Sequence, residues 1–281
     1  MQVFDGHIHR LQGDAVFAYF GWKDKCEEDA IIDSLNAASF LLYYIENGLN
    51  QQLEQEQLAP IKLRIGIDFG EEQEVLWSEY GLPPSTEVTT TSLHTDLAAK
   101  LQNQASANSI MIGDNIKTFL DLPNEFITKK TYQENGITKE KDYILKKPEI
   151  TYRMWVFQHK KYLKYFPFLE NKSYSMICIS NENQYFPNIS ALDKHMDLTY
   201  RIYHPLTIPP RGVNNIRFEW SKENRGKAAR DNNSEGKLPA NKTRNEIANE
   251  NTLFRGHHIM KCKILQNERI QNEIKFGIFI K

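Results

Sequence analysis

The stretch Ile61-Lys-Leu-Arg-Ile-Gly-Ile67 alternates apolar side chains with polar or small ones. A period of two is typical of a half-buried β-strand, and Gly70 with the acidic residues after it predicts a turn. The fold class follows from the elements that precede and follow this strand.

On the N-terminal side, apolar residues spaced by four and three predict a helix, with its stripe at Ile31, Leu35, Ala38, Leu42, Ile45 and Leu49. Three acidic residues at 27–29 suit the positive end of its dipole. Before this helix we expect two short strands, within residues 1–10 and 14–20, the first with a turn at Gly6.

On the C-terminal side we expect a strand near residues 75–77, a loop with two prolines, and a helix over residues 92–105. This helix should turn Leu93, Leu97, Leu101 and Ala105 toward the core, and a strand at 109–112 follows. The order β-β-α-β-β-α-β predicts an α+β fold, a sheet with helices on one face.

From about residue 170 the pattern changes to short β-type runs separated by polar loops, the longest of them over residues 221–248. Short strands at regular spacing predict a β-sandwich. We therefore divide the chain into a first domain at residues 1–168 and a second at 170–281.

The composition excludes several classes of partner. A formal net charge of −1 gives no surface for a polyanion, so nucleic acid is not expected. No run approaches the roughly 18 apolar residues of a membrane span. Three well-separated cysteines without a CxxC pair are typical of a reducing compartment, so we expect a soluble cytoplasmic protein.

Asp14 stands between Gly13 and an apolar, strand-like run. A carboxylate held at the mouth of a strand favours a metal site, whereas a polar residue after glycine also suits the turn of a β-hairpin. The residues alone leave both interpretations open.

Three segments in this order carry a resemblance: HRLQGDAVFAYF at 9–20, KLRIGIDFGEE at 62–72 and EVTTTSLHTDLAAKLQNQASANSIMIGDNI at 87–116. Together they resemble the class III nucleotide cyclase domain, over roughly residues 1–165, which implies a ferredoxin-like sheet. The segments RFEWSKENRGKAA at 217–229 and ANENTLFRGHHIMKCKIL at 248–265 are similar to the nucleotide-sensor domain AGS-C. This pairing resembles the pyrimidine cyclases of Pycsar antiphage defence, whose cyclic CMP or cyclic UMP activates a separate effector.

The resemblance assigns Asp14 as the second metal-binding aspartate of a site for two ions, Mg²⁺ or Mn²⁺. The family's first aspartate belongs to a segment before this chain's first residue, and neither Asp5 nor Asp68 stands in its motif. We therefore interpret the cyclase domain as N-terminally incomplete, with the activity of the chain as written left open.

The resemblance also assigns substrate contacts. Arg10 and Thr89 match the positions that contact the base, and a guanidinium suits the carbonyl oxygen of a pyrimidine. Arg10 as an outward-facing strand residue is the alternative. Lys147, with its neighbour Lys146, is expected at the triphosphate or in a solvated basic turn.

Asp96 and Lys100 match the transition-state asparagine and arginine of the family, and a spacing of four places them on one helical face. They could instead pair with each other. His94 is expected as an ordinary surface histidine, although it lies close enough in sequence to approach a nucleotide.

In the second domain Trp220 is expected in the core. His258 is expected either to sense a ligand or to serve a structural role. A basic cluster, Arg225, Lys227, Arg230 and Lys237, could attract a phosphate or simply be solvated.

The function implied by the resemblance is conversion of CTP or UTP to the 3′,5′-cyclic nucleotide and pyrophosphate by a homodimer. The alternatives are an adenylyl or guanylyl cyclase, and a non-catalytic nucleotide-binding regulator.

Overall fold

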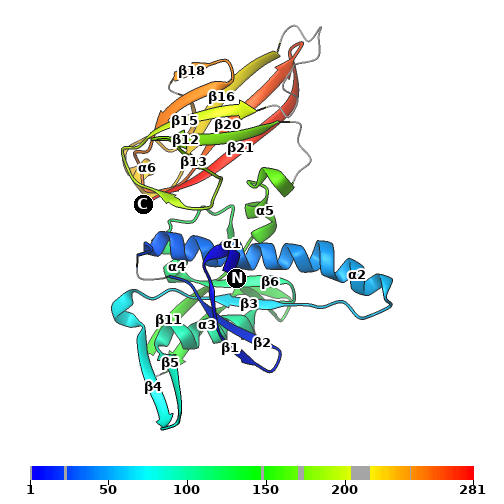
Figure 1. Cartoon of the computed structure of the whole chain (residues 1–281), viewed down its shortest axis with the longest axis vertical. Coiled ribbons are helices and arrows are strands. Elements are labelled where there is room, and N and C mark those ends of the chain that lie inside the picture. Colours follow the sequence, from blue (N-terminus) through cyan, green and yellow to red (C-terminus); the bar gives the residue numbers. More distant parts are fainter. Residues whose placement is uncertain (1, 22–23, 147–148, 170–173, 204–215, 241) are drawn as a thin grey trace. The chain divides into compact units, whose positions relative to one another are not determined.

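The computed structural model describes residues 2–21, 24–146, 149–169, 174–203, 216–240 and 242–281 (Figure 1). The chain divides into two compact units. The first comprises Met1–Phe119 and Asn124–Lys160, and the second Leu120–Pro123 and Lys161–Lys281. None of the described helices has both the length and the apolar character needed to cross a bilayer.

The first unit is built on a five-stranded mixed sheet with the order β10-β11-β6-β3, in which β7 also pairs with β11. The strands are β3 (Arg64–Ile67), β6 (Ser109–Gly113), β7 (Ile127–Lys129), β10 (Asp142–Lys146) and β11 (Glu149–Phe157). Parallel pairing of β3 with β6 places the predicted RIGI strand beside the predicted strand at 109–112. Both strand predictions are confirmed, β3 over the second half of its stretch.

Two helices cover this sheet. α3 (Leu93–Gln104) follows an N-cap at Ser92, whose hydroxyl accepts a hydrogen bond from the Thr95 amide. Its buried Leu101 packs with Met111 of β6 and Met154 of β11. α1 (Glu27–Tyr44) continues through a π-helical turn, η2 (Ile45–Leu49), into α2 (Asn50–Gln55). Leu93, expected in the core, is instead 43% exposed.

Figure 1 shows α1 and α3 on opposite sides of β3 and β6, where the sequence predicted helices on one face. The reason lies in β6, in which Ile110, Met111 and Ile112 are all fully buried. Successive side chains of a strand point to opposite faces, so both faces of this strand need a cover.

Three hairpins form two-stranded sheets of their own: β1 (His7–Gln12) with β2 (Ala15–Tyr19), β4 (Leu76–Leu82) with β5 (Ser85–Thr91), and β8 (Thr131–Glu134) with β9 (Ile137–Glu140). Short elements complete the unit: η1 (Gln2–Phe4), η3 (Glu72–Glu74) and α4 (Asp114–Phe119). The predicted order of strands and helices is observed with one correction: the segment expected as a loop with two prolines contains the strand β5, and the hairpins pair within themselves. Periodicity predicts that a segment is a strand and does not say which strand it joins.

Gly66 is the point where β3 approaches α3 most closely. A Cβ atom at this position would overlap the carbonyl oxygen of Ala98 and the amide nitrogen of Gln102. Both obstacles are helix backbone, which cannot rotate away as a side chain could.

We expect Gly66→Ala to lower the free energy of unfolding by about 2–3 kcal/mol, because β3 and α3 must move apart. Gly48→Ala is the control, since the nearest atoms there, in the Tyr44 ring, lie at an ordinary 3.4 Å. That change, in a helical segment, should be neutral or slightly stabilising. Urea unfolding of both variants measures the difference, and equal midpoints would show that the contact is looser than described.

The second unit contains two five-stranded sheets, ordered β13-β12-β15-β19-β18 and β14-β21-β20-β16-β17. The first sheet comprises β12 (Ser175–Ser180), β13 (Asn183–Tyr185), β15 (Asp197–Tyr203), β18 (Lys242–Arg244) and β19 (Ile247–Asn251). The second comprises β14 (Ala191–Leu192), β16 (Ile216–Asn224), β17 (Gly236–Pro239), β20 (Gly256–Gln266) and β21 (Arg269–Ile280). One hydrophobic core joins residues of both sheets, among them Cys178, Tyr200, Trp220 and Phe276.

Three short helices, α5 (His159–Leu163), η4 (Pro167–Leu169) and α6 (Lys227–Asp231), lie outside these sheets. The stretch at 221–248, expected as one long loop, contains the end of β16, all of α6, β17 and β18, and the start of β19. Its many Asn, Lys and Arg residues lower the local hydrophobicity without preventing pairing at the sheet edges.

Candidate functional site

The hairpins β1–β2 and β4–β5 meet along a seam that contains both residues predicted to contact a base. His9 Nε2 lies 3.3 Å from the Thr89 hydroxyl, and Arg10 forms an ion pair with Glu87. The rings of Tyr19 and Trp77 pack edge to face with centroids 5.0 Å apart. The two hairpins thus bring Arg10 and Thr89 near each other: Thr89 contacts His9, the residue before Arg10, and Arg10 contacts Glu87, two residues before Thr89.

Asp14 occupies the second position of the two-residue turn that closes β1–β2. Gly13 before it has φ +61°, a conformation that glycine adopts without strain, and Gln12 pairs with Ala15 across the turn. The Asp14 side chain is exposed. This position fits the turn interpretation and leaves the carboxylate accessible to an ion, so its role in metal binding stays a prediction.

Asp96 and Lys100 lie one turn apart on α3, and both are exposed beside the buried Leu97 and Leu101. α3 begins directly after β5, the strand that carries Thr89. Thr89 and Lys100 therefore stand on consecutive elements, whereas Arg10 is on β1. Lys147 lies outside the described residues.

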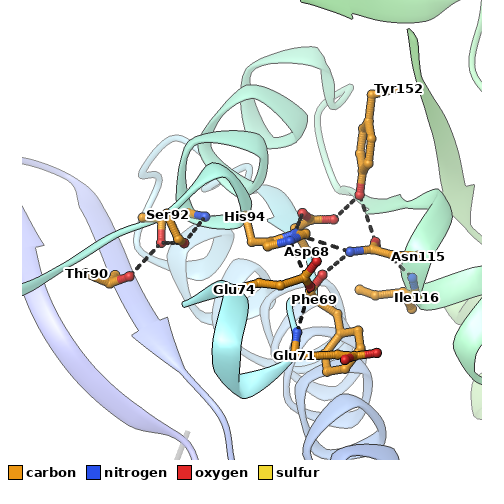
Figure 2. Close-up of polar contacts among 11 residues, drawn as sticks. Asp68, Phe69, Glu71, Glu74, Thr90, Ser92, His94, Asn115, Ile116 and Tyr152 are labelled. Atoms are coloured by element: carbon orange, nitrogen blue, oxygen red, sulfur yellow. Dashed lines mark hydrogen bonds and ion pairs between the residues drawn. The ribbon is translucent and has the colours of Figure 1, made fainter. Parts of the chain in front are cut away.

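A partly buried polar network lies at the carboxyl ends of β3 and β6 (Figure 2). His94 Nδ1 donates to Asp68 Oδ2 at 2.8 Å, and His94 Nε2 lies 3.3 Å from Glu74 Oε2. The Tyr152 hydroxyl donates to Asp68 Oδ1 and lies 2.7 Å from Asn115 Oδ1. The Asp68 side chain is 0% exposed and the His94 side chain 16%.

The charge states in this network follow from its geometry. The Asp68 hydrogen bond and charge raise the pKa of His94 above its ordinary value, against the opposing effect of burial. Burial raises the pKa of the Asp68 carboxyl, and the hydrogen bonds from His94 and Tyr152 oppose that rise. Burial, with the Asp68 charge, raises the pKa of Tyr152, so its hydroxyl remains a donor at neutral pH.

The sequence did not identify this network, because His94 was expected at the surface and Tyr152 carried no motif. One signal was available: His94 stands in the first turn of α3, directly after its Ser92 cap. Asp68 and Tyr152 are 84 residues apart, so no local pattern could pair them.

The described residues offer few protein ligands for a metal ion. Among them no group of three or more His, Cys, Asp or Glu side chains could hold a metal ion. Asp5 is engaged with Lys25 at 2.7 Å, and Asp68 is committed to His94 and Tyr152. Asp14 supplies one exposed carboxylate, and Mg²⁺ is commonly held by one or two carboxylates together with substrate phosphates. A two-ion site is not assembled by these residues alone.

In the second unit, Trp220 and His258, the residues singled out from the sequence, both form hydrogen bonds within the fold. Trp220 is buried in the core, and its indole nitrogen donates to the Asn245 carbonyl at 2.7 Å. His258 Nε2 donates to the Phe254 carbonyl at 2.8 Å, and its Nδ1 accepts from the Arg225 amide at 3.2 Å. Burial lowers the pKa of His258 to about 4, so this histidine is neutral at physiological pH and joins two loops.

The basic cluster of this unit is partly neutralised by its own carboxylates. Arg225 pairs with Glu223 at 2.7 Å, and Arg230 pairs with Glu235 at 3.0 Å. Arg230 and Glu235 are both exposed, so solvent screens this ion pair.

Comparison with known proteins places these observations in context. Residues 137–281 match the family described as the adenylyl/guanylyl and SMODS C-terminal sensor domain, AGS_C. The chain is similar to a cytidylate cyclase of Staphylococcus aureus, with 40% identity over 299 residues that cover 99% of this chain and 70% of that protein. A cytidylate cyclase of Escherichia coli shares 30% identity over 326 residues, covering 100% of this chain and 71% of that protein.

Solved structures give weaker likenesses. The guanylyl cyclase Cya2 has a TM-score of 0.43 and 17% identity, with 56% of this chain and 71% of that chain covered. The guanylate cyclase domain of RhGC from Catenaria anguillulae in complex with GTP has a TM-score of 0.42 and 14% identity, with 56% and 74% covered.

Proposed function

The chain belongs to the cytidylate cyclase family, and from this membership we propose that it converts CTP or UTP to the 3′,5′-cyclic nucleotide and pyrophosphate. In this reaction the ribose 3′ oxygen bonds to the α-phosphorus, the bond from that phosphorus to the pyrophosphate oxygen breaks, and the 3′-hydroxyl proton is released. Similarity to two cytidylate cyclases along essentially the whole chain is the observation that supports the proposal most strongly.

The named residues divide the work as follows. Arg10 and Thr89, at the seam of the two hairpins, contact the base, and Lys100 neutralises phosphate charge as a point charge. Asp96 accepts a hydrogen bond from a ribose hydroxyl or an ordered water. Asp14 would hold a divalent ion, Mg²⁺ or Mn²⁺, jointly with the triphosphate, and a bound ion would offset the negative charge there.

The assembly we propose is a homodimer whose site is completed by the partner's α3. The β4–β5 hairpin supports this, because both of its faces carry exposed apolar side chains: Leu76, Tyr80 and Leu82 on one face, Trp77 and Val88 on the other. Leu82 alone is 82% exposed, and apolar side chains exposed together on one hairpin favour an interaction site.

Further parts of the proposal concern the cell. Residues 1–168 would form a ferredoxin-like cyclase domain, and residues 170–281 a sensor domain with a β-sandwich. The cyclic nucleotide would activate a separate effector in antiphage defence. The buried thiols of Cys178 and Cys262, whose pKa burial raises to about 12, suit a reducing cytoplasm.

The test is incubation of the protein with each of the four nucleoside triphosphates and Mn²⁺ or Mg²⁺, with products separated by chromatography. We expect cyclic CMP or cyclic UMP as the fastest product. Cyclic AMP or cyclic GMP as the fastest product would favour a purine cyclase. Tight nucleotide binding without any cyclic product would favour a non-catalytic regulator.

The Arg10–Glu87 pair predicts which pyrimidine is preferred. The Glu87 carboxylate can accept a hydrogen bond from the exocyclic amine of cytosine, whereas the corresponding oxygen of uracil would repel it. We expect Glu87→Gln to lower the ratio of kcat/KM for CTP over UTP by roughly tenfold, since such a contact discriminates by about 1–3 kcal/mol. Glu79→Gln, on the neighbouring strand of the same hairpin, is the control and should leave the ratio unchanged.

A further inference from the structure

The His94 side chain links the segments that precede and follow the β4–β5 hairpin. η3 ends at Glu74 just before β4, and α3 begins at Leu93 just after β5. His94 therefore follows the hairpin in sequence and contacts Glu74, which precedes it (Figure 2). The same imidazole contacts Asp68, at the end of β3.

The geometry of these two contacts selects one charge state. Ionised Asp68 and Glu74 offer only acceptors, and a neutral imidazole can donate from only one of its nitrogens. Both contacts are hydrogen bonds only when His94 is an imidazolium. Asn115 Nδ2 is also 3.4 Å from His94 Nδ1, a donor facing a donor in that state, and it is held by the Phe69 carbonyl.

The residues around the His94 imidazole restrict its movement toward other hydrogen-bond partners. A Cβ atom on Gly70 would overlap the His94 ring, so the ring packs directly against that backbone. Asp68 is held from its other side by the Tyr152 hydroxyl. When His94 loses its proton, the exposed Glu74 is the partner that can move away.

We propose that His94 is a protonation-dependent clamp: as an imidazolium it ties the loop of Asp68 and Glu74 to the first turn of α3, and so positions the β4–β5 hairpin and α3. His94 is in this sense a positioning residue. Its effect on catalysis rests on the proposed function, because it would act through Thr89 on the hairpin and Asp96 on α3. The clamp itself does not depend on that function.

The electrostatics determine the direction of the pH response. The charged or titratable groups that face His94 are Asp68 and Glu74, with Tyr152 and Asp114 near Asp68. Because the pKa of His94 is raised above its ordinary value of 6.5, its stabilising effect is complete below that value. The effect is lost as the pH rises through the folded pKa, so the hairpin should loosen on the alkaline side.

The first measurement is an NMR titration of the histidine rings, with the His94 signal identified by its absence in His94→Gln. We expect His94 to titrate above 6.5 and to shift downward in Glu74→Gln, a change at a half-exposed side chain that should not affect folding. In a folded Asp68→Asn variant, the pKa of His94 should fall further than in Glu74→Gln. Titration at or below 6.5 in the unmodified protein would overturn the proposal.

The second measurement is amide hydrogen exchange, with rates corrected for the intrinsic effect of pH. As the pH rises through the titration, protection of β4–β5 should fall by up to roughly tenfold for each unit by which the pKa is raised. The β8–β9 hairpin is the internal control, because it also forms a two-stranded sheet of its own. Equal loss in both hairpins, or no loss in either, would contradict the clamp.

An activity measurement separates this proposal from the proposed function. If the protein cyclises CTP, kcat should decline as the pH rises through the His94 titration, and this decline should be absent in His94→Gln, whose kcat is low throughout. A decline that persists in His94→Gln would refute the positioning role. If no nucleotide is cyclised, the proposed function fails, while the titration and exchange measurements still decide whether the clamp exists.

Discussion

Replacing Asp14 by asparagine should lower kcat for CTP cyclisation by at least about 100-fold, because it removes a charged oxygen ligand worth several kcal/mol at a divalent ion. The change is close to isosteric. Asparagine serves as well as aspartate in a hairpin turn, so the β1–β2 hairpin should retain its shape. The thermal midpoint of the variant should therefore match that of the unmodified protein.

This substitution decides between the two interpretations of Asp14. If Asp14 only closes the turn, Asp14→Asn will keep both its stability and its activity. If it binds an ion, activity will fall and the concentration of Mn²⁺ needed for half-maximal activity will rise. Asp5→Asn is the control, since Asp5 is an exposed acid paired with Lys25 and should leave the Mn²⁺ requirement unchanged.

Much of the first unit could be predicted from the sequence because its elements carry local signals. The alternation in RIGI predicted a strand, and the spacing of Leu97 and Leu101 reports directly on which side chains of α3 are buried. The Ser92 cap lies at the predicted start of its helix. Such signals depend only on residues that are close in sequence. They can therefore be recognised without knowing how the rest of the chain folds.

The contacts between hairpins and the polar network could not be predicted in the same way. Arg10 meets Glu87 across 77 residues, and His94 meets Asp68 across 26. Such pairs depend on how whole elements pack, which leaves no periodic trace in the sequence. The resemblance to a cyclase selected Arg10 and Thr89 for their chemistry, but it gave no reason to examine His94.

Lys100 allows a test of whether the site is shared between two chains. Lys100→Ala should lower kcat by roughly 100-fold, because a phosphate charge loses its counter-charge in the transition state. Lys100 is exposed on α3, so its removal should not affect folding. Asp14 and Lys100 stand on different elements, and we propose that each site uses Asp14 of one protomer and Lys100 of its partner.

Co-expression of Asp14→Asn and Lys100→Ala chains with two different affinity tags gives a heterodimer that can be purified. If the site is shared, one of its two sites carries both substitutions and the other carries neither, so activity should recover to about half that of the unmodified dimer. If each site is built within one chain, every site keeps one substitution and the heterodimer will be as inactive as its parents. Because each parent homodimer has one lesion in every site, recovery above both parents can only come from a site to which two chains contribute.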